Sequence, residues 1–132
     1  MVRPIDNDEM TAVIPADGRY LFYPEVSKAE GFVVKGKKFD LKSLLQDAHL
    51  AKAYEHGSMV IARLCPSDYH RYHFPCACVP GPSRLINGWL YSVNPIAIKT
   101  NLEIFTQNKR TVCELNTEKF GKGRFFALNF CK

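Results

Sequence analysis

Short apolar segments that end at Gly, Pro or Asn constrain the fold of this chain more than any other feature of its sequence. Three of them have the length of strands and are apolar or alternating: Met59–Leu64, Trp89–Val93 and Thr111–Leu115. Strands in globular proteins run to about five or six residues, and these residue types suit a pleated, half-buried surface. The pattern therefore predicts a mainly β fold.

One helical insertion is predicted around residues 40–56. Asp40 is a suitable N-cap, and Gly57 lies just beyond the expected end. The apolar residues between them recur at the spacing of one helix face: Leu41, Leu44, Leu45 and Ala48. One continuous helix and two short pieces both remain open.

A hairpin is predicted near the start of the chain. Val13-Ile14-Pro15 runs into Asp17-Gly18, a common turn pair, and an aromatic segment containing Tyr20–Tyr23 follows. The two segments would form the arms of this hairpin.

The length of 132 residues fits one domain, which we place at residues 13–132 after an irregular N-terminal segment of residues 1–12. Apolar runs reach only about four residues, against the roughly 18 that span a bilayer. Charged residues occupy the place of a signal peptide, so we expect a peripheral membrane or cytoplasmic protein with no transmembrane segment.

Positive charge gathers in the second half of the chain. Residues 1–66 carry nine Lys and Arg against nine Asp and Glu, whereas residues 67–132 carry nine against four. This excess favours an anionic partner, such as an anionic membrane surface. No run of five basic residues occurs, so we expect no nucleic-acid partner. A mixed, solvated surface explains the same charges equally well.

The segment of residues 63–76 holds the densest cluster of reactive side chains and follows a predicted strand. His70 and His73 stand three residues apart between Pro66 and Pro75, which leaves room for a loop or a short turn. Two histidines suit acid–base work, with Asp17 as a carboxylate that would orient one of them. A structural role is also open, in which the histidines bond locally and Asp68 pairs with Arg71.

A metal site is the third alternative, with His70, His73, Cys76 and Cys78 as ligands. All four lie within nine residues, whereas tetrahedral zinc sites usually take ligand pairs from two separated segments, so we expect no metal. The cysteine count of five is odd, and we expect reduced thiols rather than a disulfide framework.

The segment Arg63–Pro75 closely resembles the signature of phosphatidylserine decarboxylases. Further blocks match this family in the same order: Val13–Gly18, Val34–Leu45, Gly88–Pro95, Asn108–Arg110 and Phe120-Gly121. The resemblance therefore covers most of the chain. It implies a compact β fold that combines features of a sandwich and a barrel.

The resemblance also implies an activity, namely the decarboxylation of phosphatidylserine to phosphatidylethanolamine in phospholipid biosynthesis. The family's enzymes cleave themselves at a serine, which becomes a pyruvoyl cofactor on a small subunit. Asp17 and His73 match the pair that activates this serine, and His70 matches a histidine of the decarboxylation step. Catalytic roles for Asp17, His70 and His73 are what the resemblance implies.

The chain departs from the family pattern because it contains no Gly-Ser-Thr motif for cleavage. Its single Gly-Ser pair, Gly57-Ser58, precedes a predicted core strand, so we expect Ser58 to be structural. We therefore expect no cofactor-binding residue in this chain, and a pyruvoyl group from a separate small subunit. The alternative is a non-catalytic module of the same fold that binds anionic phospholipid.

Overall fold

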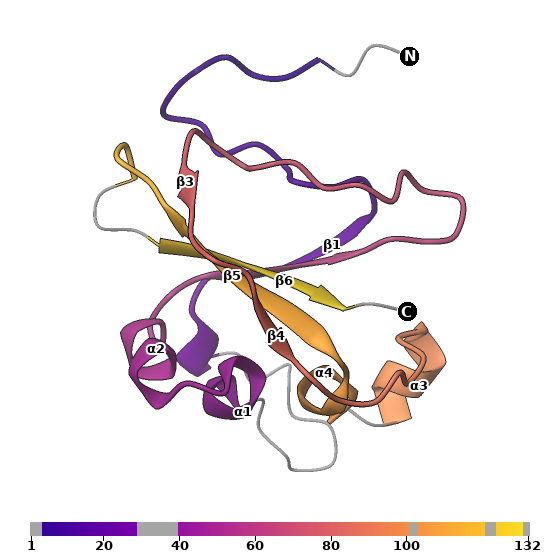
Figure 1. Cartoon of the computed structure of the whole chain (residues 1–132). Coiled ribbons are helices and arrows are strands. Elements are labelled where there is room, and N and C mark those ends of the chain that lie inside the picture. The colour runs from indigo at the N-terminus through magenta and orange to yellow at the C-terminus, as the bar shows by residue number, and fades with distance from the viewer. Residues whose placement is uncertain (1–3, 29–39, 101–102, 121–123, 131–132) are drawn as a thin grey trace. The chain divides into compact units, whose positions relative to one another are not determined.

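The computed structural model describes residues 4–28, 40–100, 103–120 and 124–130, in two small sheets and several short helices (Figure 1). In chain order the elements are β1 (Arg19–Tyr23), the 3-10 helix η1 (Val26–Lys28), α1 (Leu41–Leu45), α2 (Ala48–Ala53), β2 (Met59–Arg63), β3 (Val79–Pro80), β4 (Arg84–Ile86), α3 (Pro95–Thr100), α4 (Ile104–Gln107), β5 (Arg110–Asn116) and β6 (Arg124–Phe130). The described chain is thus mostly non-helical and β-rich, as the apolar pattern predicts.

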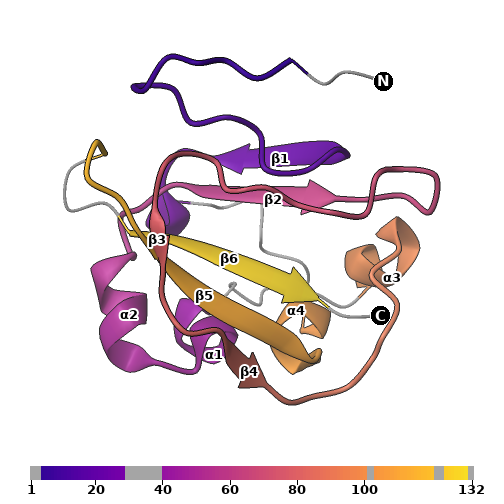
Figure 2. The same ribbon diagram turned by 45° about the horizontal axis from the view of Figure 1, so that its top comes forward.

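Strand β5 is the centre of the larger sheet. It pairs with β6 and, in antiparallel register, with β3 and β4. Pro80 faces Leu115, whereas Arg84 faces Val112, so the strand opposite β5 contains one extra residue, a bulge. The smaller sheet joins β1 and β2, whose arrows run in opposite directions in Figure 2. Two of the predicted strands, Met59–Leu64 and Thr111–Leu115, are confirmed within one residue.

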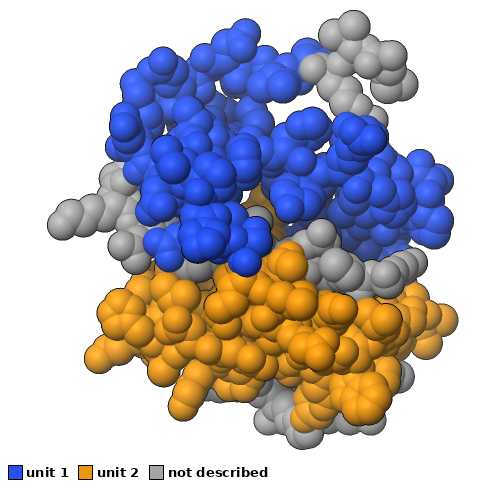
Figure 3. Space-filling model, viewed as in Figure 1, with its two compact units in different colours: residues 1–21, 61–83, 113–127 blue, residues 22–60, 84–112, 128–132 orange. Residues whose placement is uncertain are grey.

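The chain forms two compact units from interleaved segments (Figure 3). Unit 1 consists of residues 1–21, 61–83 and 113–127, and unit 2 of residues 22–60, 84–112 and 128–132. Among the described residues, no helix is both long and apolar enough to cross a membrane.

The predicted helix around residues 40–56 consists of two short helices, α1 and α2. Asp40 caps α1, since its carboxylate accepts hydrogen bonds from the amides of Lys42 (3.0 Å) and Ser43 (3.1 Å). The Ser43 hydroxyl, which also donates to this carboxylate, is the main cause that lowers the pKa of Asp40. The break falls at Gln46, whose φ of 47° is left-handed, and Asp47 then caps α2 through the Leu50 amide.

The predicted strand Trp89–Val93 is wrong. Trp89 makes a single parallel bridge with Asn108, and Asn94 and Pro95 then start α3, a helix that the prediction of one helical insertion missed. The Asn94 side chain accepts from the Ala97 amide at 2.7 Å, and proline suits the first helical position. The buried Asn108 amide bonds to both backbone groups of Tyr91, so a side chain takes the place of a strand partner.

Unit 2 has a small apolar core and a buried arginine. Its buried apolar residues are Leu44, Leu45, Ile86, Ile104, Phe105 and Val112. Arg110 opens β5 and is 0% exposed. Burial lowers the pKa of its guanidinium, and the nearby Arg84 lowers it further, yet arginine stays positively charged in proteins.

Four backbone carbonyls accept hydrogen bonds from Arg110. Nη2 and Nε donate to Ser43 and Leu44, at the end of α1, and both distances are 2.8 Å. Nη1 donates to Thr106 (2.9 Å) in α4 and to Asn108 (2.6 Å) just after it. The last carbonyls of a helix lack partners within the helix and carry partial negative charge. Arg110 therefore caps two helices at once.

Replacing Arg110 with Met should destabilise the chain by at least about 3 kcal/mol, because it leaves several buried carbonyls without donors. Arg84→Met is the matched control, since Arg84 is exposed and, among the described residues, donates to a single carbonyl, that of Leu45. The control should cost about 1 kcal/mol. Urea unfolding followed by circular dichroism measures both, and equal effects of the two substitutions would contradict the capping role.

Candidate active site

Unit 1 brings the segment before Asp17 against the segment that contains His73. The Val13 amide donates to the Pro75 carbonyl (2.7 Å) and the His73 amide to the Pro15 carbonyl (2.6 Å). One residue beyond the second bond, Ala16 and Tyr72 form an antiparallel bridge. The hairpin predicted for residues 13–23 is therefore wrong, since residues 13–16 pair with residues 72–75 and β1 pairs with β2.

This register places Asp17 and His73 on either side of the Ala16–Tyr72 bridge. In an antiparallel pair such positions are diagonal neighbours on one face, with Cα atoms about 7–8 Å apart. Asp17 is half-buried and His73 is exposed. The backbone thus brings together two residues that are 56 positions apart in the sequence, while a hydrogen bond between their side chains stays a prediction.

The turn at Asp17 depends on a close backbone approach. Gly18 has a φ of 151°, and a Cβ atom there would lie 2.5 Å from the carbonyl oxygen of Arg63 at the end of β2. The Tyr20 hydroxyl accepts a hydrogen bond from the Ala16 amide (3.1 Å) and donates one to the Ala16 carbonyl. Glycine and this tyrosine hold the backbone on both sides of Asp17.

His70 and His73 lie in the loop after β2, as predicted. A turn opens this loop, in which the Cys65 amide donates to the Asp68 carboxylate (2.6 Å) and the Asp68 amide to the Cys65 carbonyl (2.9 Å). The Asp68 carboxylate therefore stabilises this turn by a hydrogen bond. Within the described chain, no ion pair joins Asp68 to Arg71. Both histidines are exposed at the surface.

Tyr69 is a residue of this site that the sequence analysis missed. Its ring stacks on the imidazole of His73, with centroids 5.9 Å apart and an angle of 8° between the planes. The only sequence signal was that Tyr69 and His73 lie four positions apart. This spacing indicates a contact between two side chains only when the conformation of the loop is known.

Four cysteines within the described residues, Cys65, Cys76, Cys78 and Cys113, are half-buried free thiols. Burial raises the pKa of Cys76 and Cys78, and the neighbouring thiols of Cys76 and Cys113 raise that of Cys78 further. Raised pKa values keep thiols protonated, whereas metal ligation needs thiolates. No set of three or more His, Cys, Asp and Glu side chains in the described ranges is placed to hold a metal ion.

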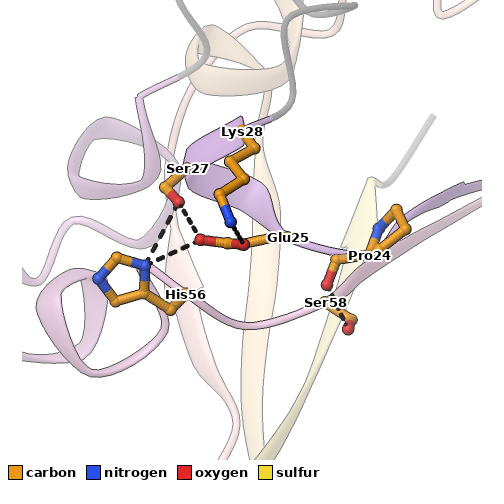
Figure 4. A network of polar contacts seen from close by, with 6 residues as sticks. All are labelled: Pro24, Glu25, Ser27, Lys28, His56 and Ser58. Carbon is orange, nitrogen blue, oxygen red and sulfur yellow. Dashed lines mark hydrogen bonds and ion pairs between the residues drawn. The ribbon is translucent and has the colours of Figure 1, made fainter.

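A second polar cluster lies in unit 2 and centres on Glu25 (Figure 4). The Glu25 carboxylate accepts from Lys28 (2.6 Å) and from the Ser27 hydroxyl (2.8 Å), and it lies 3.1 Å from Nδ1 of His56. Lys28, followed by Ser27 and His56, lowers the pKa of Glu25 to about 2.

This cluster contains Ser, His and Glu but lacks the geometry of a catalytic triad. A triad uses both imidazole nitrogens, one for the serine and one for the carboxylate. Here Ser27 and Glu25 both approach Nδ1, at 3.4 and 3.1 Å. The cluster instead joins η1 to the segment after α2, together with backbone bonds from Val26 to Gly57 and from Ser27 to Glu55.

Comparison with known proteins gives the family. The family profile for phosphatidylserine decarboxylase matches residues 1–130. The chain belongs to the phosphatidylserine decarboxylase family. The phosphatidylserine decarboxylase proenzymes of Chlamydia pneumoniae and Chlamydia caviae are each 54% identical to it over 119 residues. That of Chlamydia muridarum is 48% identical over 120 residues.

The matches cover about 90% of this chain but only 40% of each relative. The chain thus spans about two-fifths of the length of these proenzymes. The paired segments of residues 13–16 and 72–75 both belong to blocks that resemble the family, so this family resemblance and the backbone pairing concern the same residues. Residues 34–39 of one block and Gly121 of another lie outside the described residues.

Gly18→Ala should destabilise the chain by about 2 kcal/mol or more, because the new methyl group meets a carbonyl oxygen and the backbone angle is strained. Gly81→Ala is the control, since its Cβ would lie 3.3 Å from the Glu114 carbonyl at an ordinary φ. We expect the control to stay within about 1 kcal/mol of the unmodified chain. Thermal unfolding measures the difference, and equal losses would contradict this account of the turn.

The Glu25 cluster should stabilise the chain in a pH-dependent way. A carboxyl pKa of about 2, below the ordinary 4.5, adds stability that is complete above pH 4.5 and disappears as the pH falls to about 2. Glu25→Gln should therefore lower the free energy of unfolding at pH 6 and leave it nearly unchanged at pH 2. Glu55→Gln, at an exposed site, serves as the control. A Glu25 carboxyl that titrates near 4.5 by carbon NMR would refute the expectation.

Proposed function

We propose that this chain supplies the acid–base residues of a pyruvoyl-dependent phosphatidylserine decarboxylase. The reaction is the conversion of phosphatidylserine to phosphatidylethanolamine in phospholipid biosynthesis. The observation that carries the proposal is the bridge between Ala16 and Tyr72, next to Asp17 and His73. Membership of the family supports the choice of reaction.

Asp17 and His73 are assigned to activation of the serine that becomes the cofactor. An imidazole that accepts the serine proton needs a carboxylate to hold its orientation and to stabilise its charged form. Diagonal positions on one face of a strand pair are within reach of an aspartate and a histidine side chain. The proposed Asp17–His73 hydrogen bond would complete this arrangement.

His70 is assigned to the decarboxylation step. Loss of carbon dioxide leaves negative charge on the α-carbon, and a proton must then be delivered there. Imidazole exchanges protons near neutral pH, and His70 is exposed in the same loop as His73. His70 lies two positions before Tyr72 of the bridge, whereas His73 directly follows Tyr72. This difference in position suits a role for His70 that is distinct from that of His73.

The cofactor must come from another polypeptide segment. A pyruvoyl group, when bound, supplies the carbonyl that takes up the electrons left on the α-carbon. Ser58, of the single Gly-Ser pair, donates its hydroxyl proton to the Pro24 carbonyl (2.7 Å) beside the β1–β2 sheet, which supports a structural role (Figure 4). The proposal therefore assigns the acid–base residues to this chain and the carbonyl to a small subunit.

The proposal extends to partners and architecture. A small subunit that carries the pyruvoyl group would complete the enzyme, and its addition would extend the two sheets into the sandwich and barrel arrangement that the family resemblance implies. The substrate lies in a membrane, so a peripheral position at an anionic surface is part of the proposal. The positive charge of the exposed Arg71 would favour such a surface.

The test is reconstitution. Alone, the chain should release no carbon dioxide from phosphatidylserine and should contain no carbonyl that borohydride reduces. Co-expression with the part of the Chlamydia pneumoniae relative that this chain does not match should produce turnover. His70→Ala should lower that turnover at least about 100-fold, and Asp17→Asn or His73→Ala should block cleavage of the second polypeptide.

His49→Ala, on the exposed side of α2, is the matched control and should leave both steps unchanged. Turnover by the chain alone would refute the proposal. Vesicle binding without turnover in the mixture, reversed by high salt, would instead favour the non-catalytic phospholipid-binding module.

A further inference from the structure

His73 has a fixed backbone and an exposed side chain. Its amide bonds to the Pro15 carbonyl at 2.6 Å, and the Ala16–Tyr72 bridge holds the preceding residue. These bonds set the position of the Cα atom but leave the two side-chain torsions free. An exposed imidazole with free torsions points its nitrogens in several directions, so a second restraint is needed for directed proton transfer.

The ring of Tyr69 provides a contact that restrains the orientation of the His73 imidazole. It lies on the imidazole with a centroid separation of 5.9 Å and planes that differ by 8°. This nearly parallel, offset geometry is one of the two arrangements that aromatic pairs prefer. Such a pair favours the stacked orientation roughly 2- to 12-fold over unstacked ones.

Tyr69 is itself held by the turn that precedes it. The reciprocal bonds between Cys65 and Asp68, at 2.6 and 2.9 Å, fix the backbone immediately before it. Tyr69 is 36% exposed, against 55% for Tyr72. The turn, the tyrosine ring and the imidazole therefore form a short chain of contacts that ends at His73.

We propose that Tyr69 is a positioning residue that sets the plane of the His73 imidazole, an inference that rests on the proposed function for its catalytic meaning. Imidazole nitrogens make hydrogen bonds in the plane of the ring. A ring stacked on the face restrains that plane and leaves the edge, with both nitrogens, for hydrogen bonds. One nitrogen then serves the carboxylate of Asp17 and the other the reacting hydroxyl.

The test measures the orientation of His73 in the 132-residue chain by NMR. In the unmodified chain we expect nuclear Overhauser effects between the two rings and scalar couplings of one dominant χ1 rotamer. Tyr69→Leu should shift these couplings toward averaged values and remove the ring-current shift of the His73 Hδ2 proton. Tyr69→Phe should restore both, because it keeps the aromatic face.

Tyr72→Leu is the matched control, because Tyr72 is a neighbouring exposed tyrosine whose contact with this site is a backbone bridge. It should leave the His73 signals unchanged. Slow exchange of the His73 amide shows in each variant that its bond to Pro15 persists.

Three results would overturn the proposal: no contact between the rings in the unmodified chain, unchanged His73 couplings in Tyr69→Leu, or a Tyr69→Phe variant that behaves like the leucine variant. None of these measurements uses turnover. A mobile His73 ring would therefore refute the role of Tyr69 while leaving the decarboxylase assignment intact, and failed reconstitution would do the reverse.

Discussion

The organisation of unit 2 depends on a buried guanidinium that bonds to backbone carbonyls. Moving a charge out of water costs several kcal/mol unless hydrogen bonds replace the lost hydration. Arg110 obtains these bonds from carbonyls at the ends of α1 and α4, where helices have acceptors to offer. The helices α1 and α4 have five and four residues and are too short to be stable alone. The Arg110 guanidinium and the two helices therefore stabilise each other.

The site in unit 1 rests on a different principle, the pairing of two extended segments with few regular hydrogen bonds. A strand pair brings distant segments together, and the Ala16–Tyr72 bridge brings the backbone at Asp17 near the backbone at His73. Two contacts hold the backbone beside Asp17. Gly18 tolerates a close approach to the Arg63 carbonyl, and the Tyr20 hydroxyl bonds to Ala16. The backbone positions the proposed catalytic residues while His73 stays exposed and Asp17 half-buried.

Sequence reasoning succeeded where a signal and its effect lie close together in the chain. Asp40 caps the residues that directly follow it, and the apolar runs at residues 59–64 and 111–115 form strands. It failed at Trp89–Val93, where an equally apolar run bonds to the side chain of Asn108 instead of a strand. The failure has a physical cause, since a buried side-chain amide offers the same donor and acceptor as a peptide group.

The sequence by itself determined the β-rich character, the local helix caps, the loop that holds His70 and His73, and the family. These properties depend on neighbouring residues and on motif order. Only the tertiary structure decided that residues 13–16 pair with residues 72–75 rather than with β1, that the Tyr69 ring stacks with the His73 imidazole, and that Arg110 is buried. Backbone donors and acceptors are alike in every strand, so the choice among distant partners is made by packing of the whole chain.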